Sequence, residues 1–119
     1  VAHPGRTTVL FNGDGGFMLG NLAEFHSAVR AGLDLVIVLF NDGSYGAEHI
    51  QFRNKQLDPA ITLFDWPDFV TVARALGGDG IGIRGAADLE ALGPALEARD
   101  RNRPFLIDVH LDPDCVAMW

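Results

Sequence analysis

Two glycine-rich turns in the first half of the chain carry the residues best suited to chemistry. Gly13-Asp14-Gly15-Gly16 follows one apolar run, and Asn41-Asp42-Gly43-Ser44-Tyr45-Gly46 follows the next. Carboxylate and carbonyl oxygens are ligands that Mg²⁺ accepts, and backbone N–H groups beside glycine can approach a phosphate closely. Because the carboxyl ends of parallel strands meet at one edge of a sheet, the two turns together can hold a divalent cation and a diphosphate.

Other interpretations of these turns are weaker. Gly-Asp-Gly and Asn-Asp-Gly are both common in loops, so either one alone favours a plain turn. A calcium-binding EF-hand is excluded because no ligand spacing of that type, and no Glu at its twelfth position, follows Asp14. A dinucleotide-binding motif is disfavoured because Met18 stands where its third glycine would be.

The elements that must position these turns follow from apolar patterning. The pattern predicts buried strands at 7–11, 35–40, 80–83 and 104–109, and helices at 20–31, 45–54, 65–76 and 86–99. Gly32 is expected to end the first helix, and Asp65 to cap the third with Pro67 in its first turn. This alternation predicts an α/β fold over residues 1–119. We expect one domain with an open, mostly parallel sheet and helices on both faces, in three layers.

Composition restricts the partners. The chain has 119 residues, of which 48% are hydrophobic, and a net charge of −7, with Lys55 as its only lysine. Nucleic acid and anionic membranes are therefore poor partners, and a bound diphosphate would need a metal ion or backbone dipoles to offset the acidic background. Cys115 is the only cysteine, which favours a reducing, cytoplasmic location. No apolar run approaches the ~18 residues that suggest a membrane span.

The paired turns resemble the signature of thiamine-diphosphate-dependent enzymes. The resemblance is to the C-terminal, diphosphate-binding domain of the acetolactate synthase and benzoylformate decarboxylase superfamily, and it extends from about Arg6 to about Leu111. Leu22-Ala23-Glu24-Phe25 and Ala28-Val29 also resemble the family's helix after the first turn. The resemblance implies thiamine diphosphate and Mg²⁺ as cofactors. It also implies a lyase or transferase that decarboxylates or carboligates 2-oxo acids, with an acetolactate-synthase-like reaction as the default.

The resemblance also implies roles for individual residues. Asp14 matches the first metal ligand, Asp42 the second and the Ser44 carbonyl the third. Asp42 stands where the family usually has Asn, although both side chains offer an oxygen. The spacing also allows a rival register, with Asn41 and the Gly43 carbonyl as ligands. Cofactor contacts are expected from Gly13, Gly15, Gly16, Asn41, Tyr45, Gly46 and Ala47.

Two ionisable side chains come next in the sequence. Glu48 falls where some decarboxylases of the superfamily carry an active-site Glu, so it is expected to relay protons, with a solvated helix residue as the alternative. His49 is a second candidate for that role, with a structural role as its alternative.

The resemblance further implies partners for the site. In this superfamily the cofactor-activating Glu lies in a separate pyrimidine-binding domain, and the active site forms between subunits. We therefore expect a pyrimidine-binding domain from the same or another subunit, a homo-oligomer (dimer or tetramer) and a small 2-oxo acid substrate. The chain is expected to be part of a larger enzyme, or a split subunit, and inactive alone. Two alternatives are a subunit of a 2-oxoacid oxidoreductase and a non-catalytic α/β module that binds a metal or nucleotide.

Overall fold

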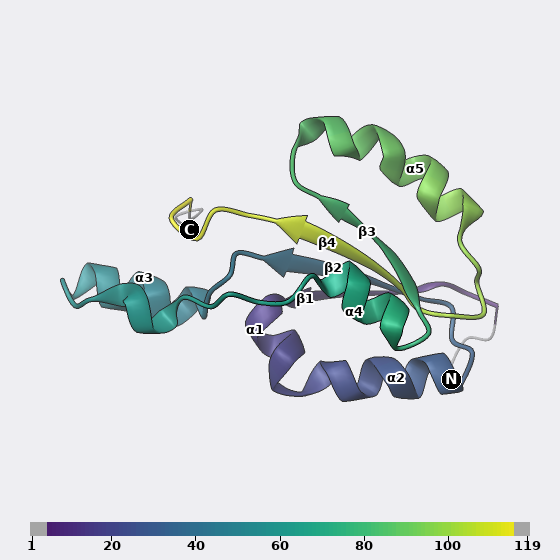
Figure 1. Cartoon of the computed structure of the whole chain (residues 1–119), viewed down its shortest axis with the longest axis horizontal. Helices are drawn as coiled ribbons and strands as arrows, with labels where there is room; N and C mark the ends of the chain where they lie inside the picture. Colours follow the sequence, from purple (N-terminus) through teal and green to yellow (C-terminus); the bar gives the residue numbers. More distant parts are fainter. Residues whose placement is uncertain (1–4, 116–119) are drawn as a thin grey trace.

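The fold is built on a parallel sheet. The structure is a computed structural model and describes residues 5–115. Four parallel strands run in the order β1-β2-β4-β3, and they comprise β1 (Thr8–Gly13), β2 (Leu35–Asn41), β3 (Asp79–Ile83) and β4 (Phe105–His110). The predicted α/β class, with a parallel sheet and helices on both of its faces, is confirmed (Figure 1).

Helical segments connect the strands. They are α1 (Asp14–Gly16), the π-helical η1 (Phe17–Asn21), α2 (Leu22–Arg30), α3 (Gly46–Asn54), the 3₁₀ segments η2 (Pro59–Thr62) and η3 (Ala86–Asp88), α4 (Phe69–Ala75) and α5 (Leu89–Ala98). The first three follow one another without a break, so helical structure begins at Asp14 rather than at residue 20 as predicted. The predicted stop is correct, because Gly32 has a φ of +60° that few other residues adopt.

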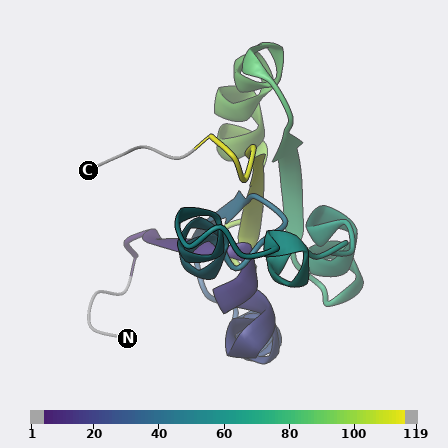
Figure 2. The ribbon, with the colours of Figure 1, turned by 90° about the vertical axis from the view of Figure 1, so that its left-hand side faces the viewer.

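Alternation along the strands divides the core into two layers. On one face, Ile37, Leu39 and Leu106 pack against the aromatic rings of Phe17 and Phe25 and against α4. On the opposite face lie Val36, Ile83, Phe105 and Ile107, with Leu92, Ala95 and Leu96 of α5 packed against them. Figure 2 shows α5 on one side of the sheet and α4 on the other. The sheet is therefore held from both faces, as parallel sheets require.

Strand β1 is less covered than the sequence predicted. It lies at one edge of the sheet, and Val9 and Phe11 are 52% and 65% exposed. Phe40 of β2 is also exposed and stacks on Phe11, with ring centroids 6.1 Å apart. The prediction of a buried strand was wrong because an apolar run reports strand propensity and not whether a helix covers it.

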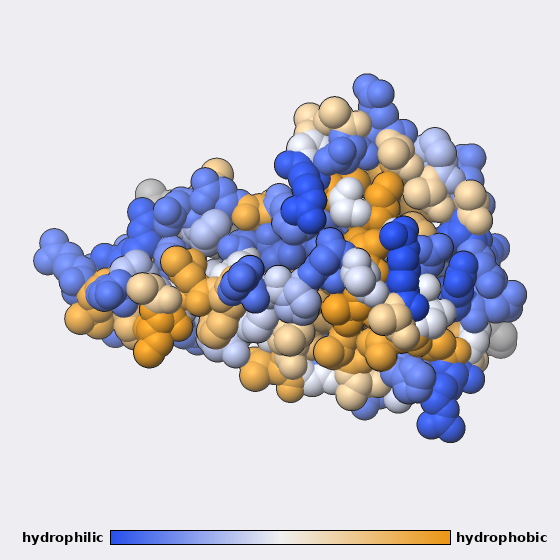
Figure 3. Space-filling model, viewed as in Figure 1, coloured by the Kyte–Doolittle hydropathy of each residue, from blue (hydrophilic) through white to orange (hydrophobic). Residues whose placement is uncertain are grey.

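Residues 46–63 form an arm that extends beyond the carboxyl ends of the strands. α3 and the segment after it point away from the sheet (Figure 1). Hydrophobic side chains lie at the surface of this arm (Figure 3), where Leu57, Ile61 and Leu63 are exposed. Within residues 5–115, none of the helices has both the length and the apolar character needed to cross a bilayer.

Helix α4 begins later than its sequence suggested. Asp68, and not Asp65, is the N-cap, because its carboxylate accepts a 2.6 Å hydrogen bond from the Thr71 N–H. Pro67 disfavours helical backbone at the residue before it, which prevents the helix from starting at Trp66. Hydrogen bonding by the Thr71 N–H holds the pKa of Asp68 below its usual range.

Replacing this cap tests the assignment. Asp68→Ala is expected to lower the free energy of unfolding by about 0.5–2 kcal/mol, while Asp65→Ala serves as the matched control and changes it little. Because the folded-state pKa of Asp68 is lowered, the cap stabilises fully above the unfolded pKa near 4. The contribution of the cap to stability is lost as the pH falls through the pKa of Asp68 in the folded protein. Urea unfolding at neutral and acidic pH measures both effects, and equal losses for the two variants would contradict the assignment.

Candidate metal and diphosphate site

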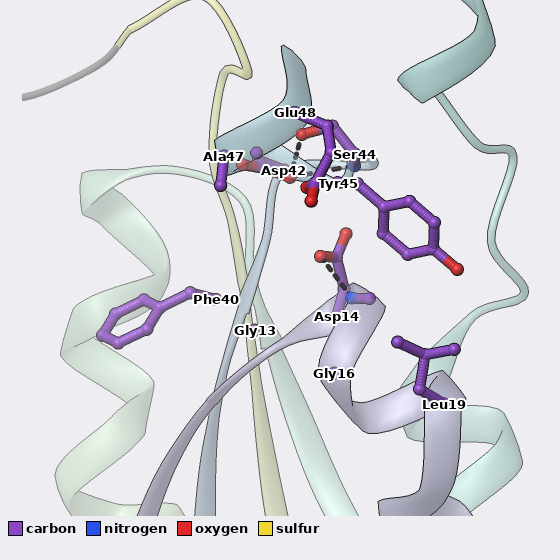
Figure 4. A pocket seen from close by; sticks show the side chains of 12 residues that line it. Gly13, Asp14, Gly16, Leu19, Phe40, Asp42, Ser44, Tyr45, Ala47 and Glu48 are labelled. Atoms are coloured by element: carbon purple, nitrogen blue, oxygen red, sulfur yellow. Dashed lines mark hydrogen bonds between the residues drawn. The ribbon is translucent and has the colours of Figure 1, made fainter. Parts of the chain in front are cut away.

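Strand register brings the two glycine-rich turns together. β1 and β2 are adjacent and parallel, with Gly13 beside Phe40 at their carboxyl ends. The first turn therefore follows β1 at the same edge where the second follows β2. The Gly43 N–H of the second turn donates a 2.8 Å hydrogen bond to Asp14 Oδ2 of the first. Figure 4 shows the Asp14 side chain directed from the start of the helix toward Asp42 and Ser44.

Asp14 is a buried carboxylate surrounded by N–H donors. Only 3% of the residue is exposed, and its Oδ1 accepts a 2.7 Å hydrogen bond from the Gly15 N–H. Its Oδ2 accepts from the Gly43 N–H and from the Trp66 Nε1–H, the latter at 2.9 Å. Burial raises the pKa of Asp14 and the nearby charge of Asp42 raises it further, while the three N–H donors oppose the shift. A bound cation would offset both the loss of solvation and the repulsion from Asp42 that disfavour the ionised form of Asp14.

The second turn presents a further carboxylate. Gly43 has a φ of +67°, a conformation that favours glycine and turns the chain sharply after β2. Asp42 Oδ1 accepts hydrogen bonds from the Ser44 N–H at 2.9 Å and from the Ser44 hydroxyl at 2.8 Å. These bonds fix the orientation of the Asp42 side chain. Its second oxygen, Oδ2, accepts no hydrogen bond within the described residues.

A cavity of about 530 Å³ lies between the turns and the start of α3. Both carboxylates and every predicted cofactor contact except Asn41 line it, together with Glu48 and two residues that were not predicted, Leu19 and Phe40 (Figure 4). The full lining is Gly13, Asp14, Gly15, Gly16, Leu19, Phe40, Asp42, Ser44, Tyr45, Gly46, Ala47 and Glu48. A side chain at Gly15 would clash, because a Cβ built there lies 2.6 Å from Cδ1 of Tyr45. The cavity lining thus combines two carboxylates with bare glycine backbone.

Asn41 does not line this cavity, although it was predicted as a cofactor contact. Its side chain is buried, and Nδ2 donates a 3.0 Å hydrogen bond to Oδ1 of Asp108 on β4. Asn41 instead lines a second cavity near Trp66 and Arg84. The Gly43 carbonyl accepts a 2.7 Å hydrogen bond from the Phe64 N–H. Asn41 Nδ2 and the Gly43 carbonyl therefore each have a hydrogen-bond partner outside this cavity.

Glu48 and His49 are consecutive residues near the start of α3, but their side chains have different surroundings. Glu48 is exposed and lines the cavity. His49 is 3% exposed, its Nδ1 lies 2.9 Å from the Thr62 hydroxyl, and its Nε2 lies 3.0 Å from Oδ1 of Asp114. His49 does not line the cavity, and both of its ring nitrogens contact side chains outside it, which favours the structural alternative for this residue. It fixes α3 to η2 and to the segment after β4.

Trp66 is a site residue that sequence reasoning missed. It lies 52 residues from Asp14 in sequence, yet its indole N–H reaches the Asp14 carboxylate. The tripeptide Asp65-Trp66-Pro67 predicts a helix start, and no local pattern relates an indole to a distant carboxylate. Only the tertiary structure reveals the contact.

The oxygen donors at this site suit a hard cation, but oxygens of a bound ligand and of water would be needed to complete its coordination. Within residues 5–115, no three His, Cys, Asp or Glu side chains gather as metal ligands. Asp14 and Asp42 supply two carboxylates, and the Ser44 carbonyl lies at the same turn. Mg²⁺ is usually held by one or two carboxylates together with water and substrate phosphates. This donor set matches that pattern and does not match a structural zinc or iron site.

Comparison with known proteins identifies the family. Residues 1–109 match the family described as thiamine pyrophosphate enzyme, C-terminal TPP binding domain. The chain therefore belongs to this family and is a domain of the kind found in thiamine-diphosphate-dependent enzymes.

Individual relatives agree with this assignment. The chain is 30% identical to a catabolic acetolactate synthase of Raoultella terrigena, over 94% of this chain and 20% of the relative. It is 33% identical to a 2-hydroxyacyl-CoA lyase of Arabidopsis thaliana, over 95% of this chain and 20% of the relative. A thiamine diphosphate-dependent 4-hydroxybenzoylformate decarboxylase of Rhodococcus jostii RHA1 superposes with a TM-score of 0.76 at 30% identity, covering 93% of this chain and 21% of that one. The chain spans about a fifth of the length of these relatives.

Glycine substitutions test the packing of the first turn. Gly15→Ala is expected to destabilise the fold by about 1–3 kcal/mol, because its Cβ overlaps the Tyr45 ring. Gly20→Ala is the matched control, since no heavy atom lies within 4 Å of a Cβ built there. In the helical segment it should be neutral or stabilise by up to about 1 kcal/mol. Thermal unfolding of both variants is the measurement.

A second substitution isolates the cause. If the overlap with Tyr45 is responsible, Gly15→Ala should cost much less in a Tyr45→Ala background. An undiminished cost in the double variant would show that the Tyr45 ring is not what excludes a side chain at position 15.

Proposed function

We propose that this chain holds the Mg²⁺–diphosphate end of thiamine diphosphate, within an enzyme that decarboxylates or carboligates 2-oxo acids in the manner of acetolactate synthase. In this proposal Asp14, Asp42 and the Ser44 carbonyl are the metal ligands. The observation that carries the proposal is the hydrogen bond from the Gly43 N–H to Asp14 Oδ2, which fixes the two ligand-bearing turns against one cavity.

The cavity supports a charged ligand that brings its own cation. Two carboxylates in a chain with a net charge of −7 repel a bare diphosphate, so a cation must separate them. Backbone at Gly15, Gly16, Gly46 and Ala47 lines the same space and is available for phosphate contacts. The engagement of Asn41 with Asp108 and of the Gly43 carbonyl with the Phe64 N–H favours the Asp42 and Ser44 register.

The chemistry in this proposal comes from the coenzyme, while the chain orients it. Thiamine diphosphate, when bound, supplies a carbanion that adds to carbonyl groups. Glu48 lines the cavity from the first turn of α3, where its carboxyl group can hold or release a proton near the reacting atoms. Leu19 and Phe40 add an apolar wall that limits water in the cavity.

The proposal includes a second domain. The cavity lining offers groups suited to a diphosphate and its cation, and we assign the pyrimidine ring to a pyrimidine-binding domain of the same or another subunit. The exposed hydrophobic residues of the arm, Leu57, Ile61 and Leu63, suit a protein contact. A homo-oligomer would place such a domain there.

Calorimetry distinguishes this function from its alternatives. Titration with thiamine diphosphate is expected to show binding that requires Mg²⁺, whereas titrations with NAD and ATP should show none. Asp14→Ala should lower the affinity for the coenzyme at least a hundredfold, because it removes a ligand that little else can replace. Glu97→Ala on α5, which lies on the far face of the sheet, is the control and should bind normally. Magnesium-independent binding, or equal losses for the two variants, would refute the site.

Substitutions at Asp42 test the ligand register. Asp42→Asn keeps a side-chain oxygen and should keep coenzyme affinity within about tenfold, whereas Asp42→Ala should lose a hundredfold or more. Asn41→Ala should reduce stability, because Asp108 loses its buried partner, but leave the affinity of the folded protein unchanged. Loss of affinity in Asn41→Ala with retention in Asp42→Ala would instead establish the rival register.

A further inference from the structure

The two carboxylate oxygens of Asp14 accept different numbers of hydrogen bonds. Oδ2 accepts two N–H donors, from Gly43 and from Trp66, while Oδ1 accepts only the Gly15 N–H. Each carboxylate oxygen offers about two lone-pair positions. Oδ2 is therefore fully used, and the open position of this carboxylate lies on Oδ1.

The indole of Trp66 is held firmly in place. Its ring stacks on Phe64, with centroids 4.5 Å apart and an interplanar angle of 12°. Phe64 in turn contacts Tyr45 at 4.5 Å, and the Tyr45 ring packs against the backbone of Gly15. An aromatic cluster of Tyr45, Phe64 and Trp66 thus fixes the donor from one side and the first glycine-rich turn from the other. The Trp66 N–H cannot move away from Asp14 without disturbing this cluster.

We propose that Trp66 is a positioning residue that makes Asp14 a one-oxygen ligand, through Oδ1, and so favours Mg²⁺ over Ca²⁺ in the site. The inference rests on the proposed function and names a determinant of its cation selectivity. Mg²⁺ requires near-octahedral geometry with short bonds to single oxygens, whereas Ca²⁺ accepts six to eight ligands and often two oxygens of one carboxylate. With the indole N–H present, Oδ2 has no open position for a second bond.

Removing the N–H opens that position. In Trp66→Phe an aromatic ring remains to stack on Phe64, but Oδ2 keeps only the Gly43 N–H. Both oxygens of Asp14 then have one open position, and the carboxylate is less firmly oriented. The affinity for Ca²⁺, which tolerates binding by both oxygens of a carboxylate, should therefore rise. The affinity for Mg²⁺, which requires a single, well-placed oxygen, should fall.

The test measures cation selectivity by calorimetry in the complete protein. Mg²⁺ and, separately, Ca²⁺ are titrated into protein equilibrated with thiamine diphosphate. The ratio of the Ca²⁺ to the Mg²⁺ dissociation constant is then compared between variants. Trp66→Phe is expected to reduce this ratio about tenfold relative to the wild type, the effect of losing one hydrogen bond to a charged group. A ratio unchanged within twofold would overturn the inference.

Two further proteins keep the test decisive. 3-Benzothienylalanine installed at position 66 keeps the shape of the indole but replaces its N–H by sulfur, and it should reduce the ratio as Trp66→Phe does. If Trp66→Phe does not fold, the protein with 3-benzothienylalanine at position 66 takes its place in the comparison. Phe64→Leu weakens the aromatic stack while retaining the indole N–H, so it should lower thermal stability and leave the ratio unchanged. Absence of cation-dependent coenzyme binding in the wild type would instead refute the proposed function itself, which separates the two failures.

Discussion

One hydrogen bond, from the Gly43 N–H to the Asp14 carboxylate, determines how the two halves of the site meet. It depends on three features of the fold: adjacent parallel pairing of β1 and β2, helical structure that begins directly at Asp14, and the positive φ of Gly43. Together these bring a carboxylate from each turn to one cavity. The same turns leave bare backbone beside the carboxylates, so groups suited to a cation and groups suited to a phosphate lie at one edge of the sheet.

The electrostatics of this arrangement favour a bound cation. Burial raises the pKa of Asp14 and the charge of Asp42 raises it further, so the ionised, ligand-free site is held at a cost in free energy. Three N–H donors reduce that cost without neutralising the charge. A site of this kind is organised before its ligand arrives, because the hydrogen bonds that orient both carboxylates are already present. Family membership points to thiamine diphosphate as the ligand, and this preorganisation supports the proposal that the cavity holds its diphosphate end with a cation.

The sequence was sufficient to predict the order of strands and helices along the chain, because alternation and glycine positions are local signals. It located the two turns for the same reason. It failed where the outcome depends on tertiary structure: β1 is exposed although its residues are apolar, and Asp68 caps α4 although Asp65 was the predicted cap. The engagement of Asn41 with Asp108, of His49 with Thr62 and Asp114, and of Trp66 with Asp14 joins distant segments, and no spacing rule predicts such contacts.

The most direct test of the account is a crystal structure of the protein with thiamine diphosphate and Mn²⁺, with anomalous scattering used to locate the cation. The account predicts a single peak within about 2.3 Å of Oδ1 of Asp14, a side-chain oxygen of Asp42 and the Ser44 carbonyl oxygen, with diphosphate oxygens completing the shell. A peak bound instead by Asn41 and the Gly43 carbonyl, or a cation located away from Asp14, would contradict it.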